Sequence, residues 1–410
     1  MSPAFRRLWA AGFVSELGDW VLRVAMPVYV YGLTGSAAAT AATFVIGLLP
    51  SLALSPVAGV LADRLDRRRV MVAVSLAQAA VLAPLLAVDG PEQLWILNAV
   101  TAAQAALAAL FEPARHALVP ALVEPERLPA ANGLIGLGEN LARLAGAALG
   151  GILLAAGGLP AVLLADAVSF ALAALLLARP LGAAAVAARG AAAPVLRSWL
   201  EGLRAIRDRP ALRSLSGVVA LMALSQGIFV VLFVVFVTDR LGGGEAEVGV
   251  LRAVQAVGGL LGGVLAGALA RRLGAARQLA LALPAFGAVA ALAWNGPLLT
   301  TAFGYYLVVF ALAGAPGVLA TAAMFSIIGA GAEAGARGRV LSSFAALTDG
   351  ATALGMILAG ALVAPLGLGA MLDLQAGLYV VAGLLWLRRL RLSRTRPTAP
   401  ARSTRAAPAR

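Results

Sequence analysis

The chain has 410 residues, of which 61% are hydrophobic and only 12% are charged. A soluble protein of this size needs about 25% charged residues to cover its surface, so lipid must cover most of this one. Every basic residue is an arginine, and the net charge is +13. The arginines lie in short segments between apolar stretches, which argues against nucleic acid as a partner. The absence of Cys and the single His116 argue against disulfides and against thiolate or histidine metal sites.

Apolar stretches of about 20 residues, the length that crosses a hydrocarbon core of roughly 30 Å, recur along the chain. They predict twelve membrane-spanning helices, over residues 9–32, 38–61, 71–88, 94–118, 134–157, 159–178, 214–238, 248–270, 278–295, 298–328, 340–364 and 368–387. The stretch that begins at 298 is too long for one straight span, and we expect it to tilt or to extend beyond the bilayer. The first stretch contains charges and lacks a clear cleavage site, which predicts a retained helix.

The loops between the predicted helices alternate in charge. Arginines are concentrated in the loops that follow even-numbered helices and in the C-terminal tail, whereas the odd-numbered loops contain only Arg240. Because loops rich in Arg remain in the cytoplasm, we expect both termini to be cytoplasmic.

A short basic segment occurs twice, half the chain length apart. Residues 59–70 read GVLADRLDRRRV and residues 267–278 read GALARRLGAARQ, each between two apolar stretches. Residues 31–41 align with 239–249 at the same offset. The repeat predicts two parallel six-helix bundles related by an axis along the membrane normal.

The repeat divides the chain into predicted parts. We expect one bundle over residues 1–178 and the other over 214–388. In the linker, 179–213, the spacing of apolar residues predicts an amphipathic helix on the inner leaflet. The basic tail, 389–410, is predicted to be disordered.

Twelve spans, duplicated halves and the GVLADR segment after the second span resemble the major facilitator superfamily. More narrowly, four segments are similar to bacterial macrolide-efflux and enterobactin-exporter-like carriers: LGDW (17–20), FEPARHALVP (111–120), ERLPAANGL (126–134) and GRVLSSF (338–344). The resemblance covers about residues 5–390. It implies an all-α major facilitator fold in the bacterial inner membrane that works by alternating access.

The resemblance also implies a cytoplasmic latch in the first basic segment. Gly59 would allow close helix packing, Asp63 would be the acidic member and Arg67 its partner, with Glu112 completing a charge relay. The full set is Gly59, Asp63, Arg64, Arg67, Arg68 and Glu112. Asp66 stands where the family usually has Gly, and the second copy has Arg271 in place of Asp63, so that copy lacks the acidic member.

Charged residues inside the predicted spans indicate functional sites, because a charge at mid-bilayer costs roughly 2.5–3.5 kcal/mol. The spacing of Glu16, Asp19 and Arg23 puts them on one face of the first helix. The sequence predicts an Asp19–Arg23 pair and leaves Glu16 without a local partner, and a proton-coupling role for Glu16 or Asp19 is the alternative. The full set of proton-coupling candidates is Glu16, Asp19, Asp166 and Asp349.

Other polar residues in the spans are candidates for a substrate cavity. Glu139 and Arg143 lie four residues apart and are predicted to pair. Asn140 and Asp349 occupy similar positions in the two halves, and we hypothesise that they face each other across a central cavity. The cavity candidates are Arg23, Glu139, Asn140, Arg143, Gln226, Arg252 and Gln255, although the two glutamines are more typical of helix packing.

These features predict a monomeric secondary transporter in the lipid bilayer. The favoured function is proton-coupled efflux of a small hydrophobic or amphipathic compound, such as a drug, a macrolide-like antibiotic or a siderophore-like metabolite. An importer or a lipid flippase of the same fold is the alternative, and a non-transporting membrane sensor is less favoured. The sequence contains no nucleotide-binding motif and no nucleophile–base set, so we expect no cofactor, no metal and no enzymatic activity.

Overall fold

The computed structural model describes residues 1–180, 203–331 and 337–395. Within these ranges it does not describe the side chains of residues 51–52, 55–64, 129, 140, 265–268, 270–271, 337–338 and 393–395. The regular elements of the described ranges are helices, without a strand: α1 (Pro3–Thr34), α2 (Ala37–Arg64), α3 (Arg67–Val81), α4 (Leu94–Leu122), α5 (Leu128–Ala178), α7 (Pro210–Leu241), α8 (Glu245–Leu273), α9 (Ala275–Trp294), α10 (Phe303–Gly331), α11 (Arg337–Leu366) and α12 (Leu368–Thr395).

The limits of α1 illustrate how local chemistry sets the helix ends. Ser2 caps its first turn, because the Ser2 hydroxyl accepts a hydrogen bond from the backbone N–H of Phe5. At the other end Gly35 adopts a left-handed conformation with φ of 61°, and its N–H donates to the carbonyl oxygen of Tyr31. A glycine is favoured there because it has no Cβ to clash.

The element α5 comprises two helices joined at a kink. It has 51 residues, which at about 1.5 Å per residue would extend to about 75 Å, more than twice the hydrocarbon core. Gly158, with φ of 63° and ψ of −166°, turns the chain back on itself. Such a backbone conformation is essentially restricted to glycine. The predicted spans 134–157 and 159–178 therefore meet at this residue.

In the described part of the chain, nine helical segments are long and apolar enough to cross a membrane. With α1, α2 and the second arm of α5, the arrangement is consistent with the twelve predicted spans. The long stretch predicted from residue 298 becomes helical at Phe303, after a short 3-10 turn over Gly296–Leu298, and continues as one helix of 29 residues to Gly331.

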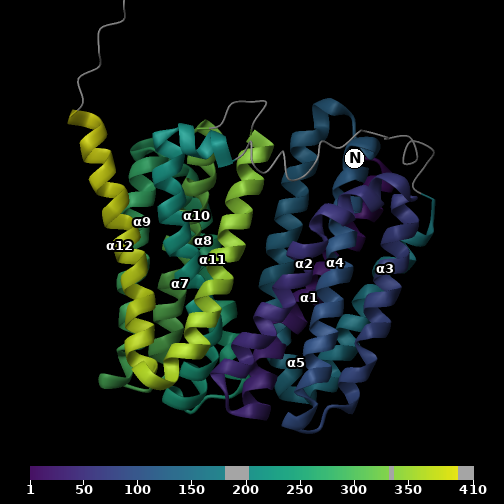
Figure 1. Ribbon diagram of the computed structural model, residues 1–410, viewed down its shortest axis with the longest axis horizontal. Helices are drawn as coiled ribbons and strands as arrows, with labels where there is room; N and C mark the ends of the chain where they lie inside the picture. The colour runs from purple at the N-terminus through teal and green to yellow at the C-terminus, as the bar shows by residue number, and fades with distance from the viewer. Residues whose placement is uncertain (181–202, 332–336, 396–410) are drawn as a thin grey trace, which may run out of the picture.

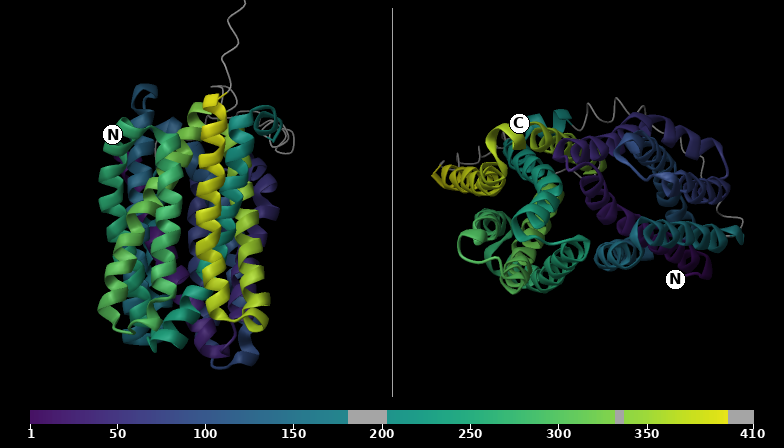
Figure 2. Two further views of the ribbon diagram at one scale, coloured as in Figure 1. Left: turned by 90° about the vertical axis from the view of Figure 1, so that its left-hand side faces the viewer. Right: turned by 90° about the horizontal axis from the view of Figure 1, so that it is seen from below.

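The helices form two groups that lie side by side, α1–α5 and α7–α12 (Figures 1 and 2). In the first group α1 packs on α5, and α2 on α4; in the second, α7 packs on α11, and α8 on α10. Each pair in one group has its counterpart in the other. The fold is therefore the pair of pseudo-symmetric bundles of the major facilitator type, and the groups contact each other mainly through α5 with α8 and α2 with α11.

Candidate functional site

A hydrogen bond joins the two groups of helices where α1 and α7 end. The Tyr31 hydroxyl donates to Oδ2 of Asp239 at 2.9 Å. These residues are 208 positions apart, the same offset as between the two basic segments, so they occupy equivalent places in the two halves. Aligned residues near a two-fold axis meet each other. The repeat in the sequence therefore already indicates this contact.

Glycines bring the backbones of the two groups into contact at the same end. A Cβ added to Gly151 of α5 would lie 2.5 Å from the Cα of Gly249 on α8. On the other side of the interface, a Cβ added to Gly360 of α11 would lie 2.8 Å from the Cβ of Ala41 on α2. Small residues allow membrane helices to approach this closely. We call the contacts at Tyr31–Asp239, Gly151–Gly249 and Gly360–Ala41 the inter-half contact.

The apolar cores follow the same division. Around the inter-half contact, one cluster of buried side chains draws on both groups, including Val28, Ala41, Leu154, Phe236, Leu251 and Ala359. Near the N-terminus the groups have separate cores. One includes Phe5, Leu8, Met71, Phe111 and Leu118, and the other includes Leu212, Leu215, Leu279, Ile328 and Phe344. The described residues thus join the halves at the end opposite the N-terminus (Figure 1), an arrangement suited to a carrier that is open at the other end.

Carboxylates of the first group surround a buried arginine. Arg115 on α4, whose side chain is 7% exposed, forms ion pairs with Glu112 at 2.9 Å and with Glu139 of α5 at 2.6 Å. Glu139 therefore has a partner on α4 that its spacing from Arg143 did not indicate, and its pair with Arg143 stays a prediction. Glu112 pairs with Arg115 and, at 3.5 Å, with His116, and its predicted relay with Arg67 stays a prediction.

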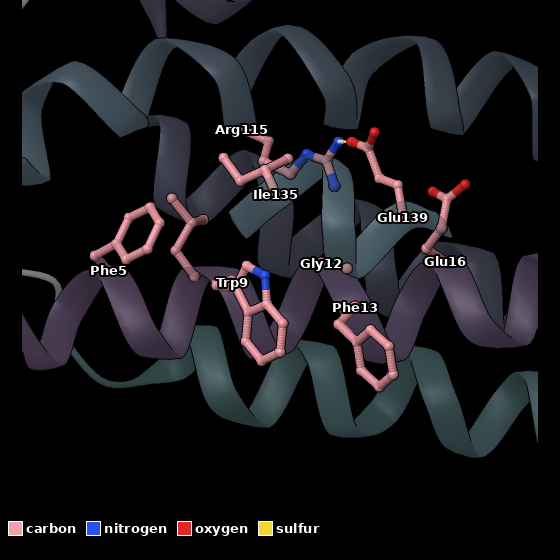
Figure 3. A pocket seen from close by; sticks show the side chains of 10 residues that line it. Phe5, Trp9, Gly12, Phe13, Glu16, Arg115, Ile135 and Glu139 are labelled. Atoms are coloured by element: carbon pink, nitrogen blue, oxygen red, sulfur yellow. Dashed lines mark hydrogen bonds and ion pairs between the residues drawn. The ribbon is translucent and has the colours of Figure 1, made fainter. Parts of the chain in front are cut away.

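A small pocket of about 10 Å³ lies beside this cluster, between α1, α4 and α5. Figure 3 shows Arg115 and Glu139 pointing toward each other and Glu16 beside them. The rings of Trp9 and Phe13 stack with centroids 5.6 Å apart. The sequence predicted that Glu16 has no local partner. In the structure its Oε1 accepts a hydrogen bond of 3.1 Å from the indole of Trp20.

A second pair of carboxylates, Asp19 of α1 and Asp166 of α5, lies where these two helices pack together. The guanidinium of Arg23 lies over the ring of Trp20, 5.3 Å from its centroid, and the ion pairs of the described residues do not include Asp19 with Arg23. The predicted pair is therefore wrong at contact distance. Arg23 nevertheless remains the strongest charge acting on Asp19, and Asp19 in turn acts on Asp166, which is completely buried in the second arm of α5.

The predicted latch is only partly visible. The side chains of Gly59, Asp63 and Arg64 lie outside the part that the structure describes. Arg67 is buried at the start of α3 and donates to the carbonyl oxygen of Ala117 on α4 at 3.2 Å. Arg68 donates to the carbonyl oxygen of Leu177 on α5 at 3.3 Å. These two arginines therefore tie α3 to neighbouring helices of its own group.

In the second group the charged candidate Arg252 of α8 lies over two aromatic rings. Its guanidinium is 4.4 Å from the ring centroid of Phe229 and 4.8 Å from that of Phe233. Arg143 of α5 is near enough to repel it. Such cation–π contacts partly replace the water that an arginine loses inside a membrane.

The remaining candidates lie on several different helices of the described chain. Gln226 accepts a hydrogen bond of 3.5 Å from the hydroxyl of Tyr379, which ties α7 to α12. Gln255 is half-buried on α8, and Asp349 is exposed on α11. The predicted meeting of Asn140 with Asp349 cannot be followed, since the Asn140 side chain lies outside the described residues. The linker helix predicted within 179–213 and the tail from 396 likewise lie largely outside them.

Two pseudo-symmetric bundles, joined at one end and carrying charges in their spans, define a transporter of the major facilitator superfamily. The family described as transmembrane secretion effector matches residues 1–408. The chain belongs to this family of major facilitator transporters.

Curated relatives and solved structures agree with this placement. The multidrug efflux pump Tap of Mycolicibacterium fortuitum is 30% identical over 380 residues, which cover 88% of this chain and 89% of that protein. Macrolide efflux protein A of Streptococcus pyogenes is 28% identical over 176 residues, less than half of either protein. A bacterial homologue of the iron transporter ferroportin in an inward-facing state superimposes with a TM-score of 0.74 at 19% identity, over 95% of this chain and 99% of that one.

Proposed function

We propose that this protein exports a small hydrophobic or amphipathic compound from the bacterial cytoplasm by alternating access, driven by the proton gradient. The observation that carries the proposal is the closed end: among the described residues, the halves share a core around the inter-half contact and have separate cores near the N-terminus. Relatives named as efflux pumps support the direction of transport.

The orientation in the membrane follows from the loop arginines. If positively charged loops and both termini are cytoplasmic, the inter-half contact is at the outer face and the carrier is open to the cytoplasm. We propose that the bundles of residues 1–178 and 214–388 then rock about the substrate, which breaks the inter-half contact and opens the outer face. A ligand moves this equilibrium only through its different affinities for the two states.

The substrate would enter beside the N-terminal bundle. The stacked rings of Trp9 and Phe13 offer apolar contact, and the carboxylates of Glu16 and Glu139 line the same pocket. A drug, a macrolide-like antibiotic or a siderophore-like metabolite combines such apolar and polar groups. The proton would bind a carboxylate within the spans, for which Glu16, Asp19, Asp166 and Asp349 are the candidates.

Dye accumulation in cells that express the chain tests this function. Ethidium and Nile red serve as charged and neutral probes, and cells with an empty vector are the control. We expect lower dye content in expressing cells and a return to the control level when a proton uncoupler is added. Higher dye content would indicate an importer, and export that survives the uncoupler would contradict proton coupling. A change in lipid distribution between the leaflets, without dye movement, would favour a flippase.

A further inference from the structure

Asp166 is the one acidic residue that is fully buried among the described residues, with 0% of its surface exposed. The hydroxyl of Ser169 lies 3.4 Å from its Oδ1 and donates at 2.8 Å to its backbone carbonyl oxygen. Its other carboxyl oxygen, Oδ2, has no hydrogen-bond partner in the described part of the protein. A buried carboxyl oxygen without a partner is rare, because leaving it unsatisfied costs free energy.

The packing of α1 on α5 encloses this carboxyl group. Gly18 of α1 lies directly against it: a Cβ added to Gly18 would be 2.5 Å from Asp166 Oδ1 and closer still to the Ser169 hydroxyl. Any side chain at position 18 would therefore displace Asp166. The missing Cβ allows α1 to cover the carboxyl group, which shields it from lipid and water.

The charges that act on Asp166 all come from α1. They are the neighbouring carboxyl group of Asp19 and the guanidinium of Arg23, while Ser169 is the polar group from α5 itself. Arg23 forms no ion pair with Asp166 in the described chain and lies over Trp20 instead. An ionised Asp166 would thus be dehydrated, unpaired and repelled by Asp19 when that group is also ionised.

We propose that Asp166 is the proton-binding site of this transporter and that Asp19 passes the proton between Asp166 and the open side of the carrier. Protonation converts Asp166 to a neutral acid, which removes the cost of a buried unpaired charge. A metal ion fits the site poorly, because sodium, magnesium and calcium need more oxygen ligands than one carboxyl and one hydroxyl group provide.

The transfer is a simple proton exchange between two carboxyl groups. A proton leaves the carboxylic acid of Asp19 and binds Oδ2 of Asp166, so that Asp19 becomes the carboxylate and Asp166 the neutral acid. Asp19 then takes a new proton from a hydronium ion on the open side, which becomes water. Glu16, one turn nearer the N-terminus, lines the pocket that opens to solvent, so the three acidic groups lie in order from solvent to the buried site. The link of this proton to substrate movement rests on the proposed function.

Infrared spectroscopy of the purified protein in lipid vesicles tests the site without a substrate. A protonated buried carboxyl group gives a carbonyl band separate from that of carboxylates and amides. We expect wild-type protein to show this band at neutral pH and to lose it as the pH is raised. Asp166→Asn should remove the band. Asp349→Asn, which changes an exposed acid in the other bundle, is the matched control and should retain it.

Three results would overturn the assignment: no such band in the wild type at neutral pH, a band that persists in Asp166→Asn, or loss of the band on addition of sodium at constant pH. Ser169→Ala provides a further check if Asp166→Asn does not fold. It should retain the band and shift its frequency, because the hydroxyl near Oδ1 is removed. An unshifted band in Ser169→Ala would place the protonated group elsewhere.

A transport measurement with the same vesicles tests the proton site and the proposed efflux function separately. With ethidium as probe and a trapped pH-sensitive dye, we expect wild type to exchange protons for ethidium. Asp166→Asn should still let ethidium run down its own gradient but should neither move protons nor accumulate the dye. Proton-coupled accumulation by Asp166→Asn would overturn the proposal. If wild type moves no ethidium while its infrared band behaves as expected, the proton site stands and efflux of this probe fails.

Discussion

Replacing Gly249 with leucine should open the inter-half contact, which the proposed orientation places at the outer face of the carrier. Gly249 and Gly151 touch through their backbones: a Cβ on Gly249 would lie 2.6 Å from the Cα of Gly151. Carbon atoms in ordinary contact are about 3.5–4.0 Å apart, so α5 and α8 must separate by at least about 1 Å to admit the new side chain. The strain exists only while the inter-half contact is closed.

The expected size of the effect follows from that overlap. Overpacking of a closely packed contact costs about 1–3 kcal/mol, which corresponds to a shift of about 5- to 150-fold toward the state in which the contact is open. Separation of the halves relieves the strain completely, so the fold of each bundle should be preserved. Transport should slow, because the closed outer face becomes harder to reach.

The absence of native cysteine makes the measurement direct. Leu251 is fully buried in the core shared by the two halves. Leu251→Cys should therefore be protected from a membrane-impermeant maleimide added to intact cells, and Gly249→Leu should expose it. Gly217→Leu, at a helical glycine with open space beside it, is the control. Equal labelling in the Gly249→Leu and Gly217→Leu backgrounds would refute the reasoning.

Further predictions use the same protein. Tyr31→Phe removes the hydrogen bond to Asp239 and should favour the outward-open state by about 1 kcal/mol, seen as a several-fold rise in the same labelling; unchanged labelling would mean that the bond has no role in closure. Arg115→Met leaves Glu139 without its ion-pair partner and Glu112 with His116 alone, and it should cost about 2 kcal/mol of stability, measured by thermal unfolding in detergent; an unchanged melting temperature would contradict this reasoning. Gly158→Ala forces a left-handed conformation on alanine at the kink and should cost about 1–3 kcal/mol, whereas Gly136→Ala, in open space on the same element, should cost little.

The sequence predicted the architecture well because hydropathy and repetition are properties of the chain itself. The predicted spans 134–157 and 159–178 meet at Gly158, whose backbone conformation suits only glycine. The family resemblance, drawn from short motifs such as LGDW, is confirmed by the match over residues 1–408. The helix ends differ from the predicted spans by several residues; α10, for example, begins at Phe303, because a 3-10 turn precedes it.

The partners of the charged residues were predicted less well. A spacing of four residues correctly places Glu139 and Arg143 on one helical face, but the same spacing cannot exclude a partner on another helix. Glu139 forms its ion pair with Arg115 of α4, whose side chain lies against Gly12 of α1. Similarly, Arg23 lies over Trp20 and does not contact Asp19.

The sequence alone determined the class of protein, the duplication and which charged residues lie within the predicted membrane spans. These properties follow from the lengths of the apolar stretches and the positions of the charges, which can be read along the chain without knowing how the helices pack. The tertiary structure decided which end of the carrier is closed, which groups Arg115 joins, and that Asp166 is buried beside Gly18 without a partner for Oδ2. Those features depend on how each helix is rotated about its axis and on which helix lies next to it, and both are set by packing between segments far apart in the chain.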